Sequence, residues 1–167
     1  MIFRFSSFVI DVDVERTREF YAREDVETTS EKCTCQGCQN YDKAILTAPA
    51  TVLDFLRSMG IDPRKPTEVF NTTGMLEEDG TIPYNGWLHV CGTLAEGPDT
   101  VIERVTEDGV RCLSFRWDLA YRPDPEYPFE LLPTREIDLI PENFPAPVLQ
   151  MEINTRLPWV LSEPYHT

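Results

Sequence analysis

The residues best suited to chemistry are cysteines, because three of the five in the chain fall within six positions, at Cys33, Cys35 and Cys38. Thiolates at C-x-C-x-x-C spacing can bind one tetrahedral zinc ion, since zinc accepts cysteine sulfur at about 2.3 Å and the glycine in this loop lets the chain curve around it. A tetrahedral site needs a fourth ligand. His89 and Cys91 are candidates, because residues two apart on a strand project from one face. The sequence therefore predicts a zinc site built from Cys33, Cys35, Cys38 and His89.

Two other interpretations of these cysteines stay open. The thiols can be inert and simply pack in a loop. Alternatively, Cys35 and Cys38 form a C-x-x-C pair before a helix, whose dipole lowers a thiol pKa, although the acidic segment 24–32 opposes this effect. A cysteine hydrolase also needs an imidazole base, and we expect His89 to be packed and His166 to be frayed at the chain end. We therefore predict a non-catalytic protein, with a thiol-dependent enzyme as an alternative.

The net charge limits the partners of the chain. Its 15 basic and 29 acidic residues give a formal charge of -14, which repels both a nucleic-acid backbone and an anionic membrane surface. We therefore expect no nucleic-acid partner and no membrane partner. A basic protein would instead be attracted. This gives a second functional alternative, an acidic module that binds a basic protein as an immunity protein or inhibitor does, with exposed aromatic residues such as Trp87 as contacts.

Length and composition indicate one globular domain over residues 1–167, because 41% of the residues are hydrophobic and 11% are aromatic. The N-terminal segment lacks the cleavage features of a signal peptide, and no apolar run approaches the roughly 18 residues of a membrane helix. We expect a cytoplasmic location, in which the cysteines stay reduced.

The N-terminal part of the chain has the spacing of one strand followed by helices. Alternating apolar residues predict a strand over 2–12, bulged at its two serines, and Asp13 is expected to cap the helix that follows. The segment 24–32 is expected to be a loop. Asn40 is a candidate N-cap for the next helix, which would fix the end of the cysteine loop.

The best helical pattern follows Pro49, which either kinks a continuing helix or lies near the start of a new one. Gly60 is expected to end this helix. The side chains predicted to face the core are Val52, Phe55, Leu56 and Met59.

Two Asp-Gly turns predict two successive hairpins, because Asp-Gly tolerates the positive φ angles of tight turns. Counting outwards from the first turn places Met75 opposite Tyr84, and counting from the second places Ile102 opposite Phe115. The two hairpins suggest a four-stranded antiparallel meander, in which Cys112 is half-buried.

The C-terminal part is rich in proline. We predict an irregular strap over 121–147 with one short strand at 136–140, and then a closing strand in which Leu149, Met151 and Ile153 alternate. Strands that follow helices without regular alternation favour an α+β fold. The predicted architecture is a mostly antiparallel sheet, with a half-barrel or a sandwich as alternatives for its curvature, and N-terminal helices packed on one side.

Five segments carry a resemblance to other sequences: 33–41 (CTCQGCQNY), 60–63 (GIDP), 68–69, 84–92 and 157–159 (LPW). Together they resemble a family of small uncharacterised bacterial proteins from Gram-positive anaerobes. The resemblance implies a cytosolic protein of an anaerobe, which agrees with reduced thiols. It implies no activity, ligand or catalytic residue.

Overall fold

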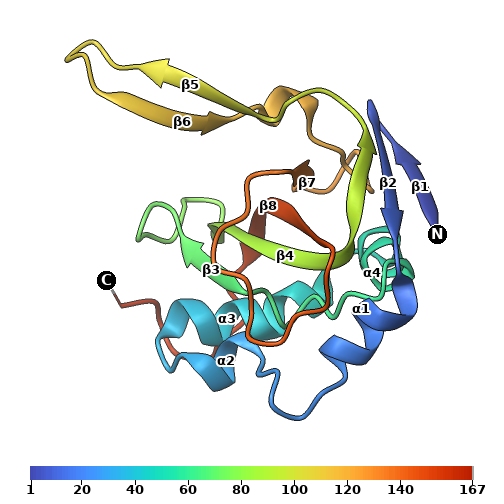
Figure 1. Cartoon of the computed structure of the whole chain (residues 1–167). Coiled ribbons are helices and arrows are strands. Elements are labelled where there is room, and N and C mark those ends of the chain that lie inside the picture. The colour runs from blue at the N-terminus through green and yellow to red at the C-terminus, as the bar shows by residue number, and fades with distance from the viewer. Residues whose placement is uncertain (167) are drawn as a thin grey trace.

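The main sheet of the protein has six antiparallel strands. In the computed structural model, which describes residues 1–166, they are β1 (Ile2–Phe5), β2 (Phe8–Val12), β3 (Glu68–Asn71), β4 (Thr81–Glu96), β7 (Phe129–Thr134) and β8 (Val148–Pro158). The longest strand, β4, is central, because it pairs with β8 along one edge and with β3 and then β2 along the other (Figure 1). The α+β class with a mostly antiparallel sheet is confirmed, and the sheet is open.

Four helices lie on one side of this sheet (Figure 1): α1 (Val14–Tyr21), α2 (Thr29–Lys32), α3 (Gln36–Ala44) and α4 (Ala50–Ser58). Buried apolar side chains of α1, α3 and α4 form one core cluster with alternate side chains of the strands. Within residues 1–166, no helix is both long enough and apolar enough to cross a membrane.

Several helix boundaries confirm the sequence predictions. The Asp13 side chain accepts a hydrogen bond from the Arg16 amide at 3.1 Å and caps α1. Pro49 directly precedes α4, so it begins a new helix and does not kink an old one. Gly60 ends α4 with φ +85°, and a Cβ there would lie 2.5 Å from the Val14 carbonyl oxygen. Of the four side chains predicted to face the core, Val52, Leu56 and Met59 are buried, whereas Phe55 is half-buried.

Two N-terminal predictions are wrong. The opening strand is a hairpin of β1 and β2, because Ser6 adopts a positive φ of 48° and turns the chain instead of bulging it. The predicted loop over 24–32 contains the short helix α2. A capping box explains this helix, since the Thr28 amide donates to the Glu31 carboxylate at 2.7 Å.

Both predicted hairpin registers are wrong. Tyr84 lies opposite Asn71 instead of Met75, because the Asn71 side chain accepts from the backbone amides that follow it and holds a longer loop. Ile102 lies opposite Ser114 instead of Phe115. The second turn is longer than a two-residue turn, with the Thr106 amide donating to the Val110 carbonyl at 2.8 Å, and a shift of one residue exchanges the two faces of a strand.

The second hairpin does not extend the sheet, so the predicted four-stranded meander is wrong. Its strands, β5 (Val101–Val105) and β6 (Arg111–Phe115), form a separate two-stranded sheet that projects from the body (Figure 1). Cys112 is exposed on this hairpin and not half-buried, whereas Cys91 is buried in β4.

Iodoacetamide is expected to alkylate Cys112 faster than Cys91 by at least about tenfold. Cys112 is exposed, whereas Cys91 is buried and its burial raises the pKa of the thiol. Peptide mass spectrometry after timed alkylation of the native protein measures both rates. After unfolding in urea, both thiols should react at similar rates, which is the control. Equal rates in the native protein would contradict the placement of β5 and β6.

The C-terminal strands are shifted from their predicted places. The strand in the proline-rich segment is β7, and 136–140 is irregular. Pro133 fits in β7 because this strand is at the edge of the sheet, where a missing N–H costs no ladder bond on the open side. The closing strand is confirmed and forms the centre of β8, next to β4.

Candidate functional site

The cysteine loop lies at the junction of two short helices. Cys33 follows the last residue of α2, and its amide donates to the Thr29 carbonyl at 3.1 Å. Cys35 is the N-cap of α3, and its Sγ accepts from the Cys38 amide at 3.4 Å. The N-cap of this helix is therefore a cysteine, so the prediction that Asn40 caps it is wrong.

Both helices are fixed to the segment that enters β3. The Thr29 amide donates to the Arg64 carbonyl at 3.0 Å, and the Lys32 ammonium donates to the Pro66 carbonyl at 2.8 Å. In α3, the buried Tyr41 hydroxyl donates to the Pro63 carbonyl at 3.2 Å. Each end of the loop is therefore attached to the same stretch of backbone, which limits how far the three thiols can separate.

Asn40 fixes α3 from the other side. It is fully buried, its Nδ2 donates to the Tyr84 hydroxyl and to the Pro158 carbonyl, and its Oδ1 accepts from the Val160 amide at 2.8 Å. The Tyr84 hydroxyl in turn donates to the Gly37 carbonyl inside the cysteine loop at 2.9 Å. A side chain that local sequence suggests as a cap therefore connects the loop to the ends of β4 and β8.

The structure brings the three predicted thiols together. The Sγ atoms of Cys33, Cys35 and Cys38 all lie within 4.8 Å of one another. Ligands about 2.3 Å from a tetrahedral zinc ion are about 3.8 Å apart, so closing on the ion requires each sulfur separation to shorten by at most about 1 Å. Cys35 is exposed and the other two are half-buried, which gives an ion a path from solvent.

The thiols interact electrostatically. The pKa of Cys33 is lowered because the Cys35 backbone amide and the side chains of Cys35 and Cys38 donate hydrogen bonds to its sulfur. The pKa of Cys38 is raised, first by burial and then by its thiol neighbours. A thiolate at Cys33 is therefore the first ligand available to a cation, and binding at Cys38 must release a proton.

His89, the predicted fourth ligand, is not part of this cluster. It is fully buried in β4, its Nδ1 is 2.8 Å from the Thr67 hydroxyl and its Nε2 is 3.2 Å from Gln150 Oε1. Because Gln150 Oε1 can only accept, Nε2 carries the proton and Nδ1 accepts from Thr67. Both nitrogens are engaged in the sheet. The other strand candidate, Cys91, is buried with its thiol 3.6 Å from the Ala146 carbonyl.

His166 lies beside the cysteine loop, where the sequence predicted a frayed end. Its backbone amide donates to the Gln36 side-chain oxygen at 2.9 Å, and the Gln36 amide group donates to the Pro164 carbonyl at 3.1 Å. A hollow of about 320 Å³ is lined by Cys35, Cys38 and His166, together with residues of β3. The alternation of proline and aromatic residues near the end was the available signal for a packed segment.

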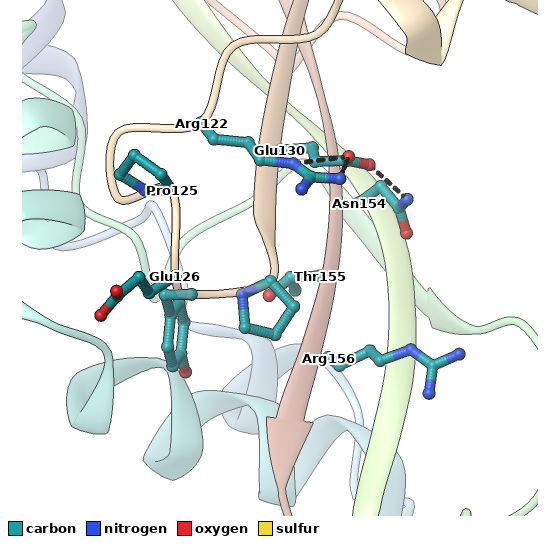
Figure 2. Close-up of a pocket in the computed structure, with 9 residues that line it drawn as sticks. Arg122, Pro125, Glu126, Glu130, Asn154, Thr155 and Arg156 are labelled. Atoms are coloured by element: carbon teal, nitrogen blue, oxygen red, sulfur yellow. Dashed lines mark hydrogen bonds and ion pairs between the residues drawn. The ribbon is translucent and has the colours of Figure 1, made fainter.

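A second hollow, of about 260 Å³, lies beside β7 and β8. Figure 2 shows Arg122 directed at Glu130, which Asn154 also contacts, with its Nδ2 donating to Glu130 Oε2 at 2.8 Å. Arg156 points away from this group (Figure 2). The carboxylate is thus neutralised by its own neighbours, and the hollow presents no cluster of thiols or imidazoles to a ligand.

A buried polar chain continues from His89 across the sheet. Gln150 accepts from the Asp138 amide at 2.7 Å, and its Nε2 donates to Glu152. Burial lowers the pKa of His89 to about 4, whereas burial raises the pKa of Glu152 to about 7. Both groups are therefore neutral between about pH 4 and pH 7, and the chain from His89 to Glu152 is a buried hydrogen-bonded network.

Comparisons with known proteins do not extend this description. A scan against protein families, a search of curated proteins and a search of solved structures each found no match. The resemblance to small proteins of anaerobes therefore stays a prediction, and the chemistry of the site follows from its own geometry.

Proposed function

We propose that the protein is non-catalytic and that Cys33, Cys35 and Cys38 hold a structural zinc ion. The observation that carries this proposal is the mutual approach of the three Sγ atoms to within 4.8 Å. Three converging thiols at the end of one helix and the start of the next match the ligand type that zinc prefers. The lowered pKa of Cys33 also favours a cation, because the thiolate is the ligand form.

Zinc would serve to join α2 to α3. Both helices are short, and α2 has only 4 residues, so neither is stable without tertiary contacts. A metal held by ligands on both sides of the junction adds its binding free energy to the folded loop. The bound loop would therefore resist proteolysis, and a chelator would remove that resistance.

Protein purified without a chelator or an affinity tag is expected to contain about one zinc per chain, measured by elemental mass spectrometry. Cys33→Ser, Cys35→Ser and Cys38→Ser should each lower zinc affinity by at least roughly a hundredfold, because each removes a thiolate ligand. Competition with a chromophoric chelator gives the affinities.

Cys112→Ser is the matched control, since Cys112 is exposed on the separate hairpin and its replacement should leave zinc affinity unchanged. The proposal would be refuted by protein that binds no zinc and in which Cys33, Cys35 and Cys38 react with a thiol reagent as fast as their exposure allows.

The thiol-dependent enzyme remains the alternative for the same cysteines. It requires an imidazole base next to a thiol, and His89 is engaged at both ring nitrogens, so His166, which lines the same hollow as Cys35 and Cys38, is the imidazole available to it. A reducing compartment, which we propose to be the cytoplasm, fits both functions because all five cysteines are free thiols.

A second candidate function is the binding of a basic protein. The projecting hairpin of β5 and β6 favours it, because Val105, Val110 and Leu113 are 59 to 70% exposed on a chain of net charge -14. Binding of this kind would weaken with salt and with Leu113→Glu. A basic partner whose affinity is unchanged by salt and by Leu113→Glu would contradict this function.

A further inference from the structure

We infer that His166 supplies the fourth ligand of the zinc site, which would make it a Cys₃His centre. This inference rests on the proposed function. It concerns the far end of the chain, more than a hundred residues from the cysteines, and it replaces His89 in the predicted ligand set. Cys₃His is one of the ligand combinations that structural zinc sites use.

Gln36 holds the backbone of the last residues against the cysteine loop. Its Nε2 donates to the Pro164 carbonyl at 3.1 Å, and its Oε1 accepts from the His166 amide at 2.9 Å. One side-chain amide thus makes a pair of hydrogen bonds with both ends of a three-residue stretch. Gln36 lies between Cys35 and Cys38 in the sequence, so the attachment point is inside the ligand loop itself.

The segment before His166 is fixed independently. The Tyr165 hydroxyl donates to the Gly74 carbonyl at 3.0 Å and accepts from Asn71 Nδ2 at 3.2 Å. Its ring packs edge-on against Trp159, with the centroids 5.2 Å apart, and the Trp159 indole donates to the Glu163 carbonyl at 2.8 Å. Figure 1 shows the C-terminal segment running beside α3. The position of His166 is therefore set by contacts on both sides of the chain.

The hollow beside the thiols leaves room for the imidazole to reach the ion. Its volume is about 320 Å³, and Cys35, Cys38 and His166 all line it. The ring nitrogens of His166 lie outside the group of atoms that are within 4.8 Å of one another. Binding would therefore require the exposed His166 side chain to change rotamer, while Gln36 holds its backbone.

Two other candidates for the fourth position are engaged. His89 bonds to Thr67 and Gln150 in the sheet. Asp42, on α3 after the cysteines, is paired with Arg64, whose Nε lies 2.7 Å from Asp42 Oδ1. The remaining competitors are Glu68, an exposed carboxylate whose charge acts on the Cys33 thiol, and water. A site with three protein ligands and water would be open to chemistry, as catalytic zinc sites are.

The test measures metal binding to the full chain and to four variants, by competition with a chelator for Zn²⁺ and by absorption spectra with Co²⁺. His166→Ala is expected to weaken Zn²⁺ binding by at least roughly tenfold. His166→Cys should restore the affinity and increase the thiolate-to-cobalt charge-transfer band, since a fourth sulfur joins the site. Glu163→Ala is the matched control, because this exposed side chain is in the same segment and only its carbonyl is used.

The outcomes distinguish failure of the three-cysteine zinc site from failure of His166 as its fourth ligand. If the wild-type chain binds no metal, the zinc site itself is refuted. If it binds zinc and His166→Ala binds it with equal affinity and an unchanged cobalt spectrum, the inference is refuted while the three-cysteine site stands. Gln36→Ala adds an independent check, because loss of the tether should weaken binding only in chains that retain His166.

Discussion

Replacing Asn40 with alanine is expected to lower the free energy of unfolding by roughly 3 to 5 kcal/mol. The change leaves two acceptors and one donor without the partners that Asn40 provides: the buried Tyr84 hydroxyl at 3.2 Å, and the partly buried Pro158 carbonyl at 3.1 Å and Val160 amide at 2.8 Å. Unpaired buried polar groups cost about 1 to 3 kcal/mol each, so their loss together is a large part of the stability of a typical domain. Urea unfolding followed by tryptophan fluorescence measures the change.

Lys43→Ala is the matched control for Asn40→Ala. Lys43 is exposed on the same helix, and its truncation should change stability by less than about 0.5 kcal/mol. The free energies of unfolding of the two variants should differ by several kcal/mol, and equal values would contradict this role of Asn40. Asn40→Ala should also weaken zinc binding at a temperature where it is folded, because Asn40 connects α3 to the strands that position the cysteine loop.

The correct sequence predictions share a local origin. The cap at Asp13, the end of α4 at Gly60 and the alternation in β8 each depend on neighbours a few residues away, and each is confirmed. The clustering of Cys33, Cys35 and Cys38 belongs to the same class. Short spacing in the chain keeps the three sulfurs close in any compact loop, so this part of the site could be predicted.

The wrong sequence predictions depend on distant partners or on turn length. Asn40 has the residue type of a cap, but its hydrogen bonds reach Pro158 and Val160, which no local rule can indicate. The register of β5 and β6 changed because a turn longer by one residue exchanges both faces. In the structure, β8 pairs with the edge of β4 that the predicted meander assigned to this hairpin, and β5 and β6 form a separate sheet.

The two histidines illustrate the same limit for the site. Strand spacing places His89 on one face with Cys91, but no local pattern indicates that Thr67 and Gln150 occupy its nitrogens. The position of His166 near the end of the chain predicts fraying, because chain ends are usually poorly ordered. The Gln36 side chain holds this end across most of the chain length, and such a tether is visible only in three dimensions.

The second large effect is on the pH dependence of stability. Glu152 is 4% exposed, and its pKa is raised to about 7 by burial, with a contribution from Asp138. A raised carboxyl pKa stabilises the fold below the unfolded pKa of about 4.5, and this stability is lost as pH rises through 7. His89 acts in the opposite direction. Burial lowers its pKa to about 4, so its contribution is present above the unfolded value of about 6.5 and is lost as pH falls through 4.

Over the interval between the two unfolded values, these contributions oppose each other in the wild-type chain. Glu152→Gln removes one of them and keeps an oxygen that can accept from the Gln150 amide group. The free energy of unfolding of the variant, relative to wild type, should therefore rise by roughly 2 to 3 kcal/mol between pH 4.5 and pH 7. Urea titrations at intervals across this range measure the difference, in which the other carboxyl groups cancel.

His89→Gln is expected to give the opposite slope. The variant lacks the imidazole whose protonation destabilises the fold in acid, so its stability relative to wild type should rise by a similar amount as pH falls from 6.5 to 4. Its amide can donate to Gln150 and accept from Thr67, which keeps the network paired. Two variants on adjacent strands with opposite pH slopes would identify the buried chain from His89 to Glu152 as their common cause, whereas parallel slopes would show that at least one of the two groups is not held in the neutral state by burial in the sheet.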